Sequence, residues 1–170
     1  MYTSRTKTGL IAATLLMLAT MPFQLSAEEN SKSFKDWGYK CETPQGSDQK
    51  ICFIFQRITS KKDDKRVADA TIAYLPKVDK PVMVITLPLG VFLPAGIQLK
   101  IDDSEDAANA PYVQCIQDGC QARIAMDDKM ITKMKGGKML NIAFLTPQQK
   151  QLGFPISLNG FTAAIDSLKK

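Results

Sequence analysis

Residues 37–58, WGYKCETPQGSDQKICFIFQRI, contain the pattern that decides the fold. Trp37, Tyr39 and Cys41 alternate with smaller or more polar residues, and an apolar run from 51 to 58 follows a stretch rich in turn formers. A period of two on both sides of a turn predicts an antiparallel hairpin. In this hairpin the sulfur atoms of Cys41 and Cys52 can lie opposite one another.

Residues 1–27 have the three-part layout of a secretory signal peptide. Two basic residues precede an apolar run from 10 to 19, and Leu25-Ser26-Ala27 supplies the small residues of a cleavage site. The run is shorter than the ~20 residues that a bilayer span needs, so we expect cleavage rather than an integral membrane anchor. The sequence therefore predicts export, with 28–170 as a single domain.

The cysteine spacing indicates disulfide bonds. In an oxidising compartment an even number of cysteines predicts disulfides, and four cysteines allow three pairings. Proximity in the sequence favours the pairs Cys41–Cys52 and Cys115–Cys120. The rival interpretation is a zinc site, but the spacings lack paired C-x₂₋₄-C units and the chain has no histidine. We therefore expect two disulfides, each contributing about 2–3 kcal/mol to stability, and no metal.

The turn between Cys115 and Cys120 decides whether that pair can form. A two-residue turn at Asp118-Gly119 would place Cys115 opposite Ala122 and out of reach of Cys120. A four-residue loop with Gly119 in the left-handed conformation places the two cysteines directly opposite. We favour this register because glycine accepts a positive φ without steric penalty.

The charge of the chain and its lack of histidine exclude several functions. The chain has 22 basic and 17 acidic residues, and two of the basic ones lie in the signal segment. This small excess does not favour binding of nucleic acid. Because histidine is missing, Ser-His and Cys-His nucleophile pairs and histidine general bases are excluded.

Further short apolar runs predict additional strands. Residues 28–35 are polar and are expected to be frayed, and residues 102–110 are polar and turn-like. Alternating or β-branched runs predict strands or hairpins at 67–75, 82–87, 97–102, 111–126, 138–146 and 154–158.

Two segments have helical signals. A cap at Asp127 or Asp128 begins a short helix that a glycine pair ends. From 161 to 168 apolar residues recur at i, i+3, i+4 and i+7, with Asn159 or Thr162 as the expected cap. The predicted class is therefore all-β, a β-sandwich of short antiparallel strands with one or two short helices, including a C-terminal helix.

Residues 87–96, LPLGVFLPAG, are apolar but contain two prolines and two glycines, so they cannot form a regular helix. In one interpretation Val91, Phe92 and Leu93 form an exposed apolar loop that docks on a partner or on lipid. In the other, the same residues cross the end of the sandwich and fill its core. Burial would stabilise each large side chain by roughly 1.5–3 kcal/mol, which favours the core interpretation.

Acidic residues occur in clusters, and two of them could meet as a glycosidase-type carboxylate pair. Surface statistics of charged residues favour solvated turns and helix caps instead. The stretch from 102 to 106 lacks the glycine and the terminal glutamate of an EF-hand loop. The clusters are Asp63-Asp64, Asp102-Asp103 with Glu105-Asp106, and Asp127-Asp128.

Methionine recurs every four residues at Met126, Met130 and Met134. Exported proteins can bind Cu(I) through such thioether sets. Methionine at helical spacing is more often core filler, and we favour that interpretation.

A series of motifs runs along the chain: Trp37 and Cys41, Cys52 and Gln56, Leu87 to Val91, Leu93 to Gly96, Ile101-Asp102, Cys115 to Cys120, and Ser157 to Ala164. In their order and spacing these motifs resemble one known family, the invasion-associated locus B proteins of Gram-negative bacteria. The resemblance implies an exported, disulfide-bonded, mainly β domain in the periplasm or at the outer membrane, associated with host-cell entry or virulence. It names no catalytic residue, and we expect no cofactor.

The sequence thus favours a non-enzymatic protein of the cell envelope, either periplasmic, outer membrane-associated or secreted. Its partner is expected to be a protein or glycan at the envelope or the host surface, with no nucleic acid and no integral membrane span. One alternative is an enzyme that acts on glycan or peptidoglycan with two carboxylates. Another is a periplasmic inhibitor or chaperone. The sequence specifies neither the ligand nor the oligomeric state.

Overall fold

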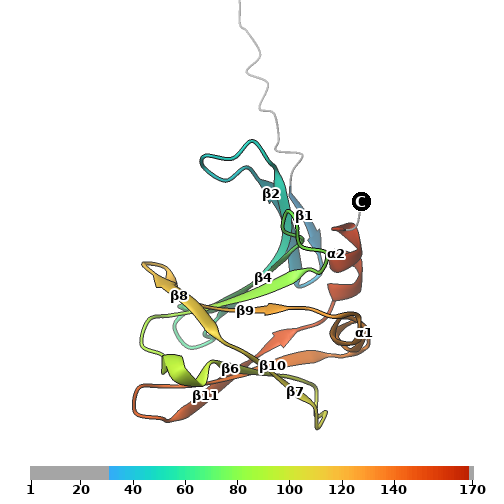
Figure 1. Ribbon diagram of the computed structural model, residues 1–170. Coiled ribbons are helices and arrows are strands. Elements are labelled where there is room, and N and C mark those ends of the chain that lie inside the picture. The colour runs from blue at the N-terminus through green and yellow to red at the C-terminus, as the bar shows by residue number, and fades with distance from the viewer. Residues whose placement is uncertain (1–30, 169–170) are drawn as a thin grey trace, which may run out of the picture.

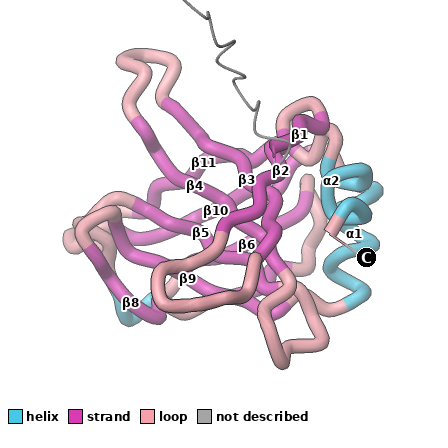
Figure 2. The backbone as a smooth tube through the Cα atoms, turned by 90° about the horizontal axis from the view of Figure 1, so that it is seen from above, coloured by secondary structure: helices cyan, strands magenta, loops and turns pink. Residues whose placement is uncertain are grey.

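A computed structural model describes residues 31–168 as two antiparallel β-sheets with two short helices on one side (Figure 1). Figure 2 shows the same arrangement from above, with both helices next to each other at the edge of the strands. The all-β class with a C-terminal helix is confirmed. The expected signal peptide and its cleavage point lie outside the described residues.

The larger sheet has seven strands and includes both predicted disulfide hairpins. All neighbouring strands within this sheet pair antiparallel. In spatial order the strands are β1 (Ser31–Phe34), β2 (Trp37–Glu42), β3 (Ile51–Thr59), β4 (Arg66–Ala73), β5 (Val82–Leu87), β9 (Gly119–Ala125) and β8 (Tyr112–Ile116).

The smaller sheet has four strands, and the chain enters it through the loop that carries the short 3₁₀ helix η1 (Leu93–Ala95). It returns to the larger sheet through Pro111, which separates β7 from β8. The helix α1 (Asp128–Gly136) precedes β10, and α2 (Phe161–Ser167) follows β11. In spatial order the strands are β11 (Gln151–Ser157), β10 (Met139–Leu145), β6 (Ile97–Ile101) and β7 (Ala107–Ala110).

The core lies between the two sheets and is filled by the inward residues of each alternating strand. Ile54, Ile72 and Ile85 come from adjacent strands of the larger sheet, and Leu140 and Ile142 come from the smaller one; all are almost fully buried. The period of two that predicts these strands therefore also selects their buried side chains.

A polar junction joins the sheets at the end where α2 begins. Trp37 is 1% exposed, its Nε1 donates to the carbonyl oxygen of Ser157 at 2.9 Å, and its ring lies edge-on to Phe161 with 5.4 Å between centroids. The Gln56 amide donates to the carbonyls of Ser157 and Asp36, and its Oε1 accepts from the Ser157 N–H at 3.0 Å. We call these residues, Trp37, Gln56, Ser157 and Phe161, the junction.

The two disulfides lie where the sequence spacing favours them. Cys41 is opposite Cys52 in the β2–β3 pair, and Cys115 is opposite Cys120 in the β8–β9 pair. The loop of the second hairpin is tighter than expected, since only residues 117–118 form the turn and Gly119 already pairs with Ile116. Gly119 has the expected positive φ, and a Cβ there would lie 2.1 Å from the carbonyl oxygen of Leu87.

Two strands occur where the sequence predicts none. β1 replaces the expected frayed segment because a tight turn, with Lys35 at a φ of 57°, returns the chain along β2; its side chains are mostly exposed, so no apolar pattern marks it. β7 lies in the stretch predicted to be turn-like and consists of Ala-Ala-Asn-Ala, residues of weak strand propensity. Backbone pairing with β6 holds it.

The expected side-chain caps of the C-terminal helix are wrong. Neither Asn159 nor Thr162 caps α2; the cap is Gly160, which has a φ of 89° and makes no side-chain hydrogen bond. A Cβ at this position would lie 2.0 Å from the carbonyl oxygen of Phe34, so β1 passes too close for any side chain. Asp127 does cap α1, as predicted, by accepting from the N–H of Met130.

Tyr112 supplies a test of core packing. Its hydroxyl is buried without a hydrogen-bond partner in the described part of the chain, and burial raises the pKa of Tyr112 to about 12 from its ordinary 10.0. Between these values the folded state binds more protons than the unfolded state, so stability should fall as pH rises. We expect Tyr112→Phe to reduce this fall without lowering stability at neutral pH; Tyr74, whose pKa is also raised by burial, still contributes to the fall. Chemical denaturation at several pH values measures both. A wild-type phenolate at residue 112 that ionises near its ordinary pKa would contradict the packing.

Candidate functional site

The predicted docking residues lie in the loop from 88 to 96, which crosses from β5 to β6. Val91 is half-buried against the core, and Phe92 is half-buried with its N–H bonded to the carbonyl of Leu145 at 2.8 Å. Leu93 is 50% exposed, and Leu89, which the sequence did not single out, is 62% exposed. The loop therefore has a core-packing side and an exposed apolar side. Partner binding by Val91, Phe92 and Leu93 stays a prediction.

The acidic clusters mainly serve local structure. Asp102 accepts from the backbone N–H groups of Lys138 and Met139, which holds the start of β10. Asp106 pairs with Lys133, and that hydrogen bond and the charges of Lys133 and Lys129 lower the pKa of Asp106. A glycosidase general acid needs a raised pKa, so Asp106 has the opposite shift.

The three methionines differ in burial. Met126 and Met134 are fully buried in the core, whereas Met130 is half-buried and lines a cleft. This arrangement agrees with the core-filler interpretation. Between residues 31 and 168, His, Cys, Asp and Glu side chains nowhere gather in groups of three or more suited to a metal ion.

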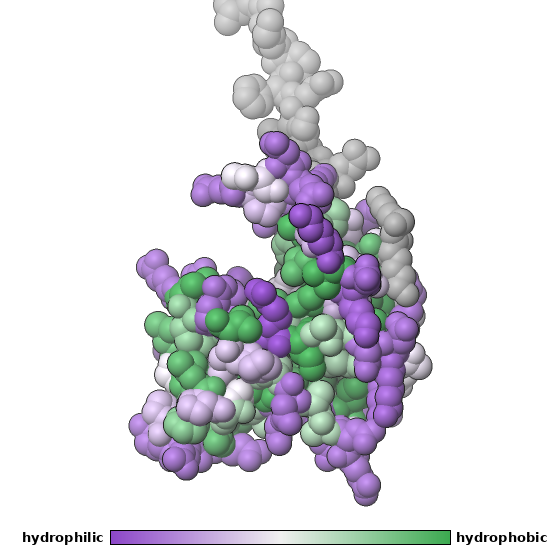
Figure 3. All heavy atoms as spheres, viewed as in Figure 1, coloured by the Kyte–Doolittle hydropathy of each residue, from purple (hydrophilic) through white to green (hydrophobic). Residues whose placement is uncertain are grey.

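The side of the seven-stranded sheet that faces away from the core is hollowed between the β2–β3 hairpin and the β8–β9 turn. Figure 3 shows this hollow at the left of the molecule. Its volume is 390 Å³. We call this surface the outer face; it consists of Lys40, Glu42, Phe53, Phe55, Arg57, Arg66, Asp69, Thr71, Thr86, Asp118 and Gln121.

An aromatic pair lies on the outer face. Phe53 and Phe55 have 6.0 Å between ring centroids, and Phe55 is 37% exposed. Phe55 is opposite Gly38 in the β2–β3 register, and a Cβ at Gly38 would lie 2.5 Å from the Phe55 ring. The glycine therefore leaves the space in which the ring lies against β2, and this contact fixes the orientation of a solvent-exposed aromatic side chain.

A pair of guanidinium groups borders the aromatic pair. Arg57 Nε and Arg66 Nη1 each lie 2.8 Å from a different carboxylate oxygen of Asp69. The hydrogen bond and charge of Asp69 raise the pKa of Arg57. Arg66 also donates to the carbonyl of Asp118, which connects β4 to the β8–β9 turn. One carboxylate thus orients two arginines that remain accessible at their outer edges.

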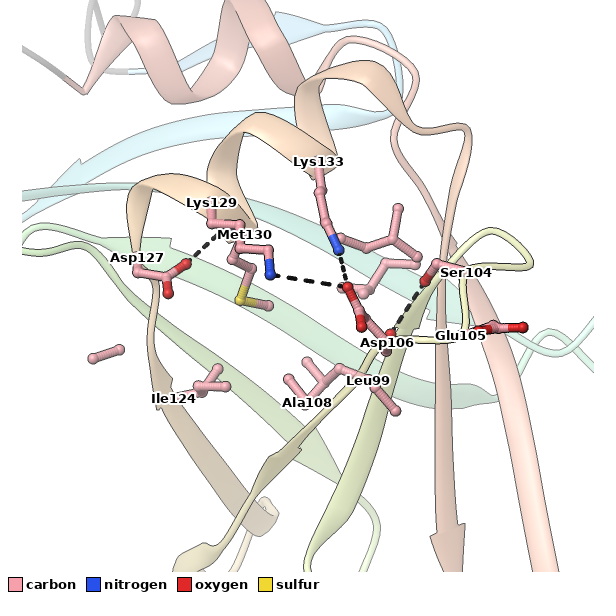
Figure 4. Close-up of a pocket in the computed structure, with 14 residues that line it drawn as sticks. Leu99, Ser104, Glu105, Asp106, Ala108, Ile124, Asp127, Lys129, Met130 and Lys133 are labelled. Carbon is pink, nitrogen blue, oxygen red and sulfur yellow. Dashed lines mark hydrogen bonds and ion pairs between the residues drawn. The ribbon is translucent and has the colours of Figure 1, made fainter.

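A second hollow, which we call the cleft, lies between the sheets beside α1 and has a volume of 520 Å³ (Figure 4). Its floor is apolar and comes from β6, β7, β9, β10 and α1. At its rim Lys129 and Lys133 project from α1 toward Asp106, on the loop between β6 and β7. The floor residues are Leu99, Ile101, Ala108, Ile124, Met130 and Leu140.

The sequence contained a partial signal for each hollow. Residues 51–58 carry apolar side chains on both faces of the strand, which is one face more than a half-buried strand needs. Lys129 and Lys133 have the i, i+4 spacing of one helix face. Neither pattern identifies the distant residues, such as Gly38 or Asp106, that complete the surfaces.

Between residues 31 and 168, no helix combines the length and the apolar character that crossing a membrane requires.

Comparison with known proteins gives a consistent result. The sequence model of the family described as "Invasion associated locus B (IalB) protein" matches residues 37–169. A Brucella abortus protein named Invasion protein B homolog is 32% identical over 142 residues, which cover 81% of this chain and 78% of that protein. Invasion protein B of Bartonella bacilliformis is 25% identical over 160 residues, covering 92% and 83%.

A solved structure has the same fold. The crystal structure of invasion associated protein B from Bartonella henselae aligns with a TM-score of 0.69 at 21% identity. The alignment covers 81% of this chain and 93% of that one. At this identity the similarity concerns the arrangement of the strands and helices.

We expect Gly38→Ala to displace the Phe55 ring and leave the fold intact, because the new methyl group meets only the end of a movable side chain. The readout is the set of NMR contacts between residue 38 and the Phe55 ring, which should be lost. Gly136→Ala is the matched control, since a Cβ there meets no atom within 4 Å. If the ring keeps its place over residue 38 in the alanine variant, Gly38 does not set its orientation.

Proposed function

This chain belongs to the invasion-associated locus B family, and from that premise we propose that it is an exported, non-enzymatic protein of the cell envelope that acts by binding a partner. The partner is a protein of the envelope or of the host surface, and it binds the outer face. Association with host entry follows from the names of the relatives and is part of the proposal.

Export is supported by the signal-peptide layout of residues 1–27 and by the two disulfides. Disulfides persist in oxidising compartments outside the cytoplasm. In the part of the chain described here every cysteine is paired. The location that we propose is the periplasm, the outer membrane surface or the exterior.

A non-enzymatic role is supported by the chemistry of the side chains. The chain contains no histidine, and Asp102 and Asp127 accept backbone hydrogen bonds in structural roles. Asp106, the carboxylate at the rim of the cleft, has a lowered pKa and is therefore a poor proton donor. The relatives are named as invasion proteins and not as enzymes.

The binding proposal rests on one observation. The Phe55 ring lies over Gly38 and beside Phe53, and next to this pair Asp69 holds two arginine side chains. Aromatic and arginine residues are enriched in protein interfaces and dominate their energetic hot spots. A ring that is already oriented loses little conformational entropy on binding. The polar groups around the pair, including Thr71, Thr86 and Gln121, would form the rim of such an interface.

The second candidate surface is the exposed side of the loop from 88 to 96. Leu89 and Leu93 present apolar side chains there, next to the predicted docking residues Val91 and Phe92. This surface has no charged residue between 88 and 96, and its one aromatic side chain, Phe92, is half-buried, whereas Phe55 on the outer face is exposed. We therefore place the loop second.

Photocrosslinking in intact cells tests the proposal. A photoreactive phenylalanine analogue is introduced at Thr71 on the outer face, at Leu93 in the loop, or at Ala163 on the exposed side of α2 as a control. The producing bacterium is irradiated alone and in contact with host cells, and adducts are identified by mass spectrometry. We expect one discrete protein adduct from position 71 that disappears when Phe55→Ser is added.

Other crosslinking results would contradict the proposed surface or the proposed kind of partner. An adduct from position 93 that is insensitive to Phe55→Ser would transfer binding to the loop and contradict the outer face. An adduct that is sensitive to glycosidase and resistant to protease would replace the protein partner with a glycan. The same adducts from positions 71 and 163, or none from any position, would contradict specific partner binding.

A further inference from the structure

We propose that the cleft beside α1 binds a free medium-chain carboxylate, with the acyl chain on the apolar floor and the carboxylate at Lys129 and Lys133. This site is separate from the outer face, so the inference does not depend on partner binding there. Three features of the cleft support this proposal: its volume, its lining and its charge arrangement.

The cleft has the size and lining of a small-molecule site. Its 520 Å³ lies within the roughly 300–1,000 Å³ that is usual for ligand pockets, which are mostly apolar with a few polar groups. Leu99 and Leu140 at its base belong to the core and are nearly fully buried. Ile124 and Met130 are half-buried against that core and leave part of their surface open to the cleft.

The floor suits a flexible chain better than a rigid ring. Met130 places a polarisable and adaptable thioether on one wall, between the aliphatic side chains of the sheets. Within the described residues no aromatic side chain lines the cleft. Each methylene group of an acyl chain that enters would be stabilised by removal of its apolar surface from water.

The rim has one more ammonium group than its central carboxylate can neutralise. Lys133 bonds to Asp106 Oδ2, while Lys129 lies 4.0 Å from the same oxygen, outside hydrogen-bond distance. The two lysines are one helical turn apart and converge on the same point (Figure 4). A ligand carboxylate next to Asp106 would complete the pairing of Lys129.

The remaining acids of the rim leave this position open. The Asp127 carboxylate accepts from the N–H of Met130 at the start of α1. Glu105 points away from the cleft in Figure 4. The hydroxyl of Ser104 bonds to the carbonyl of Asp106 and so holds the loop that carries the central carboxylate. The lining as a whole has three carboxylates and two ammonium groups, but at the position between the lysines an anionic head group is favoured over a cationic one.

An NMR titration with decanoate, at concentrations below micelle formation, tests the inference. Decanol and decyltrimethylammonium have the same chain with a neutral or a cationic head. We expect decanoate to bind most tightly, with direct contacts between its chain and the Met130 methyl group. Lys129→Gln and Lys133→Gln should each weaken decanoate binding by about three- to fivefold, the usual scale for a partly exposed charge pair.

Two further variants test whether the charge at the rim determines the affinity for decanoate. Asp106→Asn should strengthen decanoate binding by a similar factor, because both ammonium groups then face the ligand. Lys62→Gln is the matched control, since it removes one positive charge from an exposed loop outside the cleft and should have no effect. These substitutions lie at the surface, and the Met130 contacts give a readout that does not depend on any variant.

The inference is overturned if decanol binds as tightly as decanoate, because the lysines then recognise nothing. Tighter binding of the cationic amphiphile, or weaker binding of decanoate by Asp106→Asn, would mean that the cleft prefers a positive head group. Chain contacts at the outer face, or no binding at all, would show that the cleft is not a carboxylate site.

Discussion

The hydrogen bond from the buried Trp37 indole to the Ser157 carbonyl is the interaction on which the arrangement of the two sheets depends. A buried indole N–H needs a partner, and here the partner belongs to the last strand of the other sheet. The Gln56 amide bonds both the N–H and the carbonyl of Ser157. Phe161 then packs on the indole and fixes the start of α2. A network in which each of these groups is satisfied specifies one orientation of the sheets.

This orientation leaves two surfaces free for recognition. Since the core is filled from the inner faces, the outer face of the larger sheet can carry Phe53, Phe55 and two arginines without any role in the core. The helix α1 covers only part of the gap between the sheets, which leaves the cleft beside it. One surface is shaped for a macromolecule and the other for a small amphiphile. Of the two, only the cleft is lined by residues of both sheets and therefore depends on the relation between them.

Local patterns predicted much of this fold, and non-local contacts account for the remainder. Alternation from 37 to 58 predicted the first hairpin, and short spacing predicted both disulfide pairs. β1 and β7 were missed because their own side chains carry no apolar strand pattern, and the Gly160 cap was missed because it depends on the nearby backbone of β1. Of the predicted docking residues, only Leu93 is largely exposed. The outer face and the cleft require pairings such as Phe55 with Gly38 and Lys133 with Asp106, which no single segment contains.

Native-state hydrogen exchange at the Ser157 amide tests the central claim most directly. If the junction unites the sheets, this amide, which donates to the Gln56 side chain, exchanges only when the whole domain unfolds. Its protection should then equal that of the central strands β4 and β10 at every denaturant concentration. An amide at Ser157 that exchanges much faster, while both strands stay protected, would mean that the sheets separate independently and would contradict the account.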